Sequence, residues 1–153
     1  SQHGKNFLLT MQRLLQERDA LSVVSDEIGA PTWAATIARV TAELVRKRNA
    51  GQAGPSGLYH LSASGEASWY GFACSIAERL RQEGRLRAEI TPILSRNYPT
   101  AAQRPLNSRL NCARLRQDWG VTLPDWETAL HECLNRARGF DSEEAPQPVA
   151  AGR

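Results

Sequence analysis

The sequence has no long apolar run, few cysteines and no motif typical of covalent chemistry. Arg, Glu, Gln or Ser interrupt its apolar stretches every few residues, whereas a membrane-spanning helix needs roughly 20 apolar residues. We therefore expect neither a membrane segment nor a secretion signal. Cys74, Cys112 and Cys133 are an odd number without the paired spacing of metal ligands. They are most simply reduced thiols in a cytoplasmic protein.

A basic surface for nucleic acid is also missing from the sequence. The net charge is only +3, and arginines are spread over nearly the whole length. The densest basic run, 46–48, falls at the predicted end of a helix, where cations complement the helix dipole. A nucleic-acid surface would instead gather Lys and Arg on one face with interleaved aromatic residues. The basic residues are therefore interpreted as a solvated surface, and no nucleic-acid partner is expected.

Catalytic and cofactor motifs are absent as well. Gly51, Gly54 and Gly57 have the spacing of a dinucleotide-binding loop. However, a helix is predicted before them and a strand after them, which is the reverse of the order that a phosphate-binding loop requires. No tyrosine is followed four residues later by lysine, and the histidines lack carboxylate or cysteine neighbours at ligand spacing. We therefore assign no catalytic, cofactor-binding or metal-binding residue.

The length sets a further limit on what the chain contains. With 153 residues the chain amounts to about one domain, too little for a nucleotide-binding fold and a substrate domain together. Residues 1–140 are expected to fold, and the acidic, then Pro- and Ala-rich segment 141–153 is expected to be a disordered tail. The chain is thus too short to be a complete two-domain α/β enzyme.

The hydrophobic pattern predicts helices that alternate with short strands. Ser68 and Asp125 are predicted helix caps, Gly84 a helix stop, and Pro92 confines its strand to a sheet edge. Uncovered strand edges also predict that the isolated chain self-associates or has low stability. The predicted helices are 6–18, 31–47, 68–83, 112–119 and 125–134, and the predicted strands are 21–24, 57–62 and 89–94.

Several spaced motifs occur in a fixed order along the chain, and together they are far more specific than any one of them. They resemble those of the dTDP-4-dehydrorhamnose reductases, which are extended short-chain dehydrogenases, from about Gly4 to Leu134. The motifs are Gly4-Lys-Asn-Phe7, Asp26-Glu-Ile-Gly-Ala-Pro-Thr-Trp33, Gly57-Leu-Tyr-His60, Ser68-Trp-Tyr-Gly-Phe-Ala73, Arg104-Pro-Leu-Asn-Ser108 and Leu123-Pro-Asp-Trp126.

The resemblance implies an α/β fold, the C-terminal portion of a Rossmann-type short-chain dehydrogenase, helix-rich with a few short strands. It implies that the complete enzyme reduces dTDP-4-dehydro-L-rhamnose to dTDP-L-rhamnose with NADPH in dTDP-rhamnose biosynthesis. The glycine loop and the Tyr-x-x-x-Lys pair would then lie in a missing N-terminal Rossmann half, and this chain alone would be inactive. The alternative is a non-catalytic binding or regulatory subunit of the same fold.

The resemblance also bears on metal binding. Some relatives bind Mg²⁺ between subunits through glutamates. The matching regions of this chain, Ala34-Ala35-Thr36 and Asn135-Arg136, offer no carboxylate. We therefore predict no metal ion.

The loop motifs supply the candidate substrate-binding residues. Asn6 opens a helix, so its amide and the free N–H groups of that turn are candidates for a sugar hydroxyl or a phosphate oxygen, with a plain helix cap as the alternative. Arg104 is the candidate for the pyrophosphate, because a guanidinium gives paired charge-assisted hydrogen bonds. Trp69 and Trp126 are expected in the core rather than against a base. The predicted substrate-binding residues are Asn6, Glu27, Gly29, Pro31, Thr32, Arg104 and Asn107.

Overall fold

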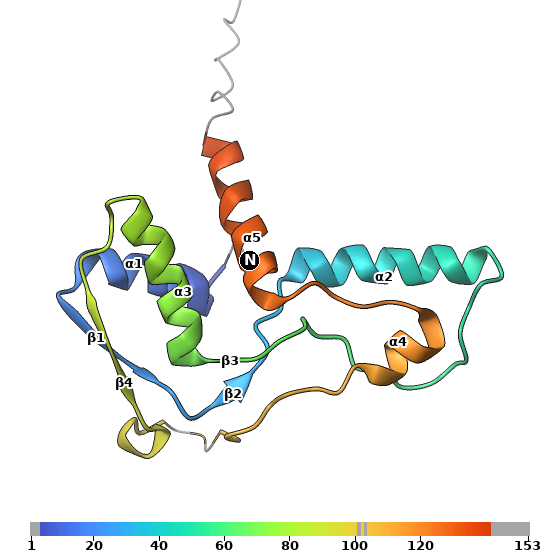
Figure 1. Cartoon of the computed structure of the whole chain (residues 1–153), viewed down its shortest axis with the longest axis horizontal. Coiled ribbons are helices and arrows are strands. Elements are labelled where there is room, and N and C mark those ends of the chain that lie inside the picture. Colours follow the sequence, from blue (N-terminus) through green and yellow to red (C-terminus); the bar gives the residue numbers. More distant parts are fainter. Residues whose placement is uncertain (1–3, 101, 103, 142–153) are drawn as a thin grey trace, which may run out of the picture.

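The computed structural model describes residues 4–100, 102 and 104–141. Of the tail predicted at 141–153, Asp141 is the last residue of α5, and residues 142–153 lie outside the described residues. Figure 1 shows the β1–β4 pair beside α1 and α3, with α5 rising between this part and the long helix α2. The elements are α1 Phe7–Glu17, β1 Ala20–Val24, β2 Ile28–Gly29, α2 Ala34–Asn49, β3 Ala67–Ser68, α3 Trp69–Gln82, β4 Glu89–Ile93, the 3₁₀ turn η1 Ser95–Asn97, α4 Ala113–Trp119 and α5 Trp126–Asp141.

The larger sheet consists of two parallel strands, β1 and β4. Ala20 pairs with Glu89, and Val23 pairs with Pro92. Pro92 has no N–H to donate, so its place in a pair with one open side agrees with the predicted edge position. Within the described residues neither strand has a second partner. Both β1 and β4 therefore present an unpaired edge.

The main core lies where α1, α3 and α5 meet β1. Its apolar side chains recur at helical spacing along α1 and α3, as the sequence pattern predicted. Leu15 and Ala73 are fully buried, and Ile76 and Leu80 nearly so. The backbone N–H groups of Arg87 and Ala88 both donate to the Leu15 carbonyl at 3.0 Å, which ties the end of α1 to the start of β4. The core thus fixes α1 and α3 against the sheet.

Local sequence signals set the ends of α3. The Ser68 hydroxyl accepts a hydrogen bond from the Gly71 N–H at 3.0 Å, so Ser68 is the N-cap that the sequence predicts. At the other end Gly84 has φ +67°, a left-handed conformation that glycine adopts without steric cost. Both predicted limits of this helix are confirmed.

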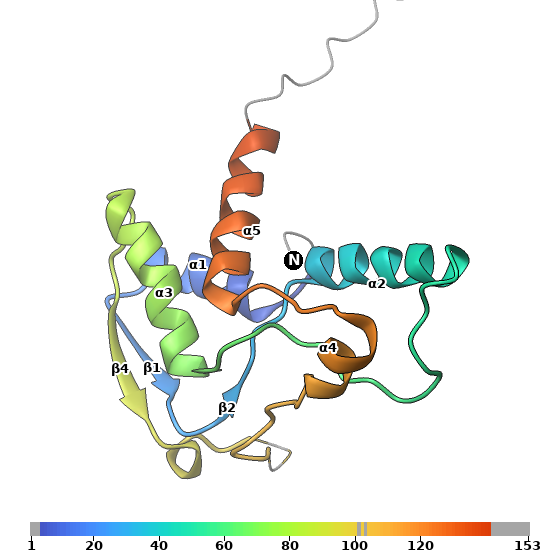
Figure 2. The same ribbon diagram turned by 45° about the vertical axis from the view of Figure 1, so that its right-hand side comes forward.

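A second, smaller core holds α2 and α4 together. Val40 of α2 packs with Leu115 of α4, and Val121 and Leu123 complete the cluster. Figure 2 shows α2 and α4 on the opposite side of the molecule from the β1–β4 pair. None of the helices in the described part of the chain is both long and apolar enough to cross a membrane.

The strand predicted at 57–62 is wrong. Residues 57–62 form no strand in the structure. The Tyr59 hydroxyl instead donates to the Pro55 carbonyl at 2.6 Å and lies 2.9 Å from Asp118 Oδ2. Tyr59 and Leu61 pack against the second core. The alternating apolar residues therefore serve contacts with α4 rather than a sheet.

The helix predicted to begin at Pro31 begins three residues later, at Ala34. The Thr32 hydroxyl donates to the Ala30 carbonyl at 2.9 Å and accepts from the Ala63 N–H at 3.1 Å. These bonds hold the segment before Trp33 outside the helix. Within α2, Thr36 and Val40 are buried whereas Ile37 is 36% exposed.

Truncation of a side chain should lower the free energy of unfolding more in the main core than on the exposed surface of a helix. Ile76 is 1% exposed and Val45 is 54% exposed. We expect Ile76→Ala to lower the free energy of unfolding by about 2–5 kcal/mol, because it leaves a cavity in the main core. Val45→Ala is the control, with an expected loss below about 0.5 kcal/mol. Urea unfolding followed by circular dichroism measures both, and equal losses would contradict the assigned core.

Candidate functional site

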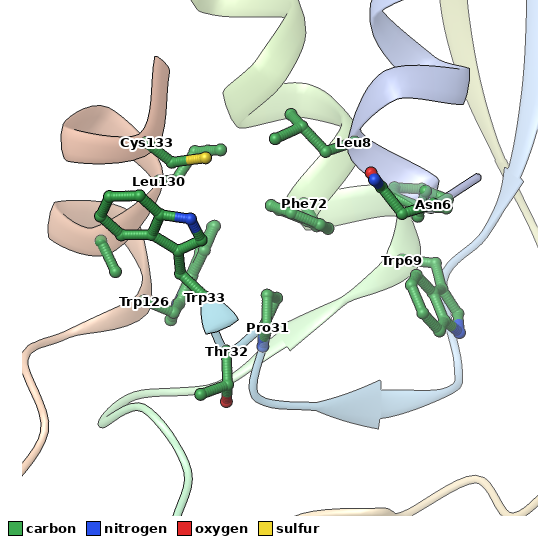
Figure 3. Close-up of a pocket in the computed structure, with 12 residues that line it drawn as sticks. Asn6, Leu8, Pro31, Thr32, Trp33, Trp69, Phe72, Trp126, Leu130 and Cys133 are labelled. Atoms are coloured by element: carbon green, nitrogen blue, oxygen red, sulfur yellow. The ribbon is translucent and has the colours of Figure 1, made fainter. Parts of the chain in front are cut away.

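Three adjoining clefts meet around Trp69, the first residue of α3. The helix cleft has a volume of about 230 Å³ and lies between α1, α3 and α5 (Figure 3). The loop cleft, about 370 Å³, lies between the segment 27–31 and the segment 104–108. The strand cleft, about 450 Å³, lies between α1, β1 and Tyr98. Trp69 lines all three clefts, and Pro31 and Phe72 line the helix and loop clefts.

The predicted site residues gather at two of these clefts, with one exception. The exception is Asn107, which lines none of the three. Figure 3 shows Phe72 between the side chains of α5 and those at the start of α1, with Pro31 and Thr32 below it. Asn6 and Thr32 line the helix cleft, Glu27, Gly29 and Arg104 line the loop cleft, and Pro31 lines both.

Asn6 is the N-cap of α1. Its Oδ1 accepts a hydrogen bond from the Leu9 N–H at 3.1 Å, and its extended backbone precedes the first helical turn. The capping alternative is therefore confirmed. A role toward ligand stays a prediction, supported by the place of Asn6 at the rim of the helix cleft.

Backbone pairing fastens the two walls of the loop cleft to each other. The Ile28 N–H donates to the Leu106 carbonyl, and the Ser108 N–H donates to the Ile28 carbonyl, both at 2.8 Å. A Cβ atom on Gly29 would lie 2.7 Å from Ser108 Oγ and would displace this hydroxyl from its hydrogen bond to the Ile28 carbonyl. Asn107 Oδ1 accepts from the N–H and the Nε of Arg109, at 3.1 and 2.9 Å. Gly29 and Asn107 thus shape the loop cleft whether or not they touch a ligand.

Glu27 and Trp69 are joined across the loop cleft. The Trp69 indole Nε1 donates to Glu27 Oε2 at 3.0 Å. The Trp69 ring also contacts Phe7, with centroids 4.7 Å apart and planes tilted by 47°. Trp69 remains 36% exposed, so the expectation that it lies in the core is wrong. Trp126, by contrast, is 8% exposed and belongs to the main core, as expected.

Arg104 lines both the loop cleft and the strand cleft. Its side chain is exposed and makes no ion pair or hydrogen bond with another residue of the described segments. Arg109, on the same segment, is instead paired with Glu66 at 2.6 Å. Of these two guanidinium groups, that of Arg104 is the one left to meet an anion.

A carboxylate secures the turn behind the loop cleft. Asp26 accepts hydrogen bonds from the Ser95 N–H at 2.8 Å and from the Ser95 hydroxyl at 3.0 Å. Burial opposes ionisation of Asp26, but these hydrogen bonds and the nearby Arg96 outweigh it and hold the pKa of Asp26 below its ordinary value. The charge of Asp26 therefore stabilises the junction of the β1–β2 turn with η1.

Neither a metal centre nor a reactive thiol is built at these clefts by the described residues. The described segments hold no group of three or more His, Cys, Asp or Glu side chains placed to bind a metal ion. Cys133 borders the helix cleft, but burial raises the pKa of its thiol.

The glycines at 51, 54 and 57 do not fit a dinucleotide-binding loop. They follow α2, and the residues after Gly57 form no helix until α3. A Cβ atom on Gly54 would lie 2.4 Å from the Asp118 carbonyl oxygen, so this glycine serves close packing against α4.

Comparison with known proteins places this site in a family. The model of the RmlD substrate binding domain matches residues 1–138. The chain is 42% identical over 139 residues to a dTDP-4-dehydrorhamnose reductase of Burkholderia thailandensis, covering 86% of this chain and 46% of that protein. It is 40% identical over 134 residues to a dTDP-4-dehydrorhamnose reductase of Escherichia coli K12, covering 86% and 44%.

Solved structures of dTDP-4-dehydrorhamnose reductases also resemble this chain. A dTDP-4-dehydrorhamnose reductase of Bacillus anthracis in complex with NADP superposes with a TM-score of 0.77 at 30% identity, covering 88% of this chain and 44% of that one. A reductase of Clostridium acetobutylicum gives a TM-score of 0.76 at 31% identity, covering 88% and 45%. The predicted α/β fold is thereby confirmed. The chain spans less than half the length of each of these relatives.

The lowered pKa of Asp26 predicts how stability depends on pH. A carboxyl whose folded pKa is depressed stabilises the fold above its unfolded pKa, about 4, and that contribution is lost as pH falls through the folded value. Asp26→Asn should therefore be less stable than the parent at pH 7, and the difference should shrink below about pH 4. Urea unfolding at pH 7, 5, 4 and 3 measures the difference. Asp19→Asn, which changes an exposed ion pair with Arg87, is the control, and a pH-independent difference for Asp26→Asn would contradict the assignment.

Proposed function

This chain belongs to the RmlD substrate-binding domain family, and on that basis we propose that it supplies the nucleotide-sugar site of a reductase. The complete enzyme would convert dTDP-4-dehydro-L-rhamnose to dTDP-L-rhamnose with NADPH. One observation carries the proposal. The predicted substrate residues other than Asn107, although far apart in sequence, border the adjoining helix and loop clefts.

The remainder of the enzyme would come from a Rossmann half that holds the cofactor and the catalytic groups. The sequence has no Tyr-x-x-x-Lys pair, and Gly51–Gly57 does not fit a phosphate-binding loop. A parallel pair of strands is rarely stable without further strands and helices on its faces. The unpaired edge of β1 therefore offers the other half a place to extend the sheet. In its absence, the same edge would favour self-association of the chain.

Arg104 would hold the pyrophosphate. Its guanidinium borders the loop and strand clefts and has no competing carboxylate partner among the described residues. A guanidinium can donate two parallel hydrogen bonds to a phosphate group. The Arg104 side chain would thus fix one end of the substrate within this chain.

The sugar and its linkage would be oriented at the helix cleft. The first turn of α1 leaves backbone N–H groups that are not bonded within the helix, and Asn6 and Thr32 lie beside them. The Thr32 hydroxyl already bonds the Ala30 carbonyl and the Ala63 N–H, so it would position the loop rather than give the main polar contact. The chain would therefore bind and orient substrate, and the proton and hydride would be supplied by the other half.

Activity measurements test the proposal directly. We expect residues 1–153 alone to show no NADPH oxidation with dTDP-4-dehydro-L-rhamnose, because the sequence has no Tyr-x-x-x-Lys pair to donate the proton. The full-length polypeptide should show turnover. Binding of dTDP by the full-length polypeptide without turnover would favour a non-catalytic binding or regulatory subunit, and absence of both would contradict the proposed site.

Substitution of Arg104 tests its assigned role. Arg104→Ala should weaken dTDP binding by the full-length polypeptide about tenfold and raise KM for the dTDP-sugar, because it removes charge-assisted hydrogen bonds. Arg116→Ala is the matched control, since Arg116 is exposed on α4 and lines none of the three clefts. Titration calorimetry with dTDP measures both variants. Equal affinities of Arg104→Ala and the parent would remove Arg104 from the site.

A further inference from the structure

Trp69 stands at a position where a protein does not ordinarily leave a large aromatic ring. It is 36% exposed, although burial of such a ring is strongly favourable. The other tryptophans are less exposed than Trp69. Trp126 lies in the main core, Trp119 packs against the second core, and the Arg136 guanidinium lies 5.2 Å from the ring centroid of Trp33. The exposed surface of Trp69 faces the junction of the helix, loop and strand clefts.

The Trp69 ring is held in place even though it is exposed. Its only polar atom, Nε1, is satisfied by Glu27 Oε2 at 3.0 Å. Phe7 packs against the ring, with centroids 4.7 Å apart. A ring that is already ordered loses little conformational entropy when a ligand stacks on it. Trp69 is therefore a pre-organised aromatic surface at the junction of the three clefts, next to the charged side chains of Glu27 and Arg104.

The charges around the ring select which part of a nucleotide sugar suits it. Glu27 and Arg104 both line the loop and strand clefts together with Trp69. The Glu27 carboxylate disfavours a phosphate group beside the indole, whereas Arg104 attracts one nearby. The sugar has to reach catalytic groups outside this chain. The flat, uncharged base is the part that remains for the indole.

We propose that Trp69 is the stacking platform for the pyrimidine base of the nucleoside diphosphate, and that Glu27 is a positioning residue that holds the indole. This inference rests on the proposed function and goes beyond it by assigning the base to one side chain. Arg104 beside Trp69 then explains how one chain binds the base and the pyrophosphate together. Glu27 acts on the base through Trp69 and makes no contact with it.

Binding of two probes by the full-length polypeptide tests the platform. dTDP carries the base, the deoxyribose and the diphosphate but not the hexose of the substrate, and inorganic pyrophosphate carries neither base nor sugar. Trp69→Leu should weaken dTDP binding about tenfold, the usual scale for loss of one base–aromatic stack. Binding of pyrophosphate should stay within about twofold of the parent. Trp69→Phe keeps a flat ring and should recover most of the dTDP affinity.

The matched control is Trp119→Phe. Trp119 is remote from the three clefts and packs beside Tyr59 in the second core, with ring centroids 6.3 Å apart. Quenching of tryptophan fluorescence by dTDP should fall in Trp69→Phe, with a remainder from Trp33 and Trp126 of the helix cleft, and should be unchanged in Trp119→Phe. Circular dichroism establishes that each variant folds. If Trp69→Leu fails to fold, Trp69→Phe decides by its fluorescence, and unchanged quenching in that variant overturns the proposal.

A double-mutant cycle tests the positioning role of Glu27. Glu27→Gln keeps a hydrogen-bond acceptor for the indole and should bind dTDP as the parent does. Glu27→Ala should weaken dTDP binding about threefold, and it should have no further effect in the Trp69→Leu background, because it acts through the indole. An equal loss in both backgrounds would show that Glu27 acts independently of Trp69 and overturn this part.

The outcomes distinguish the stacking role of Trp69 from the proposed function of the chain. If the parent binds dTDP and Trp69→Leu binds it equally well, the platform is wrong while the proposed function stands. The same result is expected for a ring that stacks on the hexose, because dTDP lacks the hexose, and it too would overturn the platform. If the parent binds neither dTDP nor pyrophosphate, the proposed function itself fails and the platform fails with it.

Discussion

Phe7 contacts both Trp69 and Phe72, and this aromatic contact sets where α1 and α3 lie relative to the clefts. The ring centroids of Phe7 and Phe72 are 5.5 Å apart and nearly stacked, and Phe72 meets Trp126 edge-on at 5.8 Å. One cluster thereby joins the first turns of α1, α3 and α5. Aromatic pairs of this geometry add stability beyond the area they bury. The floor of the helix cleft is thus continuous with the main core, so the binding surface is as rigid as the fold.

The loop cleft depends on a second constraint, the backbone pairing of residue 28 with residues 106–108. These hydrogen bonds and the absence of a side chain on Gly29 bring two distant loops into contact. Asp26 braces the same region through Ser95. Because the chain itself satisfies these polar groups, Glu27 and Arg104 are presented on walls that need little rearrangement to receive a ligand. The fold itself therefore orders the walls of the loop cleft before any ligand binds.

The sequence predicts most of the fold where the signal is local. The Ser68 cap, the Gly84 stop and the edge position of Pro92 each depend on the conformational preference of one residue, and each is confirmed. The residues near the clefts were predicted from the ordered motifs, because contacts between loops that are distant in sequence leave no local sequence pattern. The errors have tertiary causes. Thr32 delays the start of α2 through its bond to Ala63, and Tyr59 turns toward Asp118 instead of joining a sheet.

The exposure of Trp69 could not be predicted from helical periodicity, which only places it on the same stripe as buried residues. What leaves it open is the arrangement of three clefts around the start of α3, with Glu27 satisfying the indole N–H. The central claim is that this junction is where the chain binds the nucleotide part of its substrate. A crystal structure of the full-length polypeptide with dTDP tests it most directly. The account predicts the diphosphate within hydrogen-bonding distance of Arg104 and the base over Trp69. Bound dTDP at any other surface, away from both side chains, would contradict it.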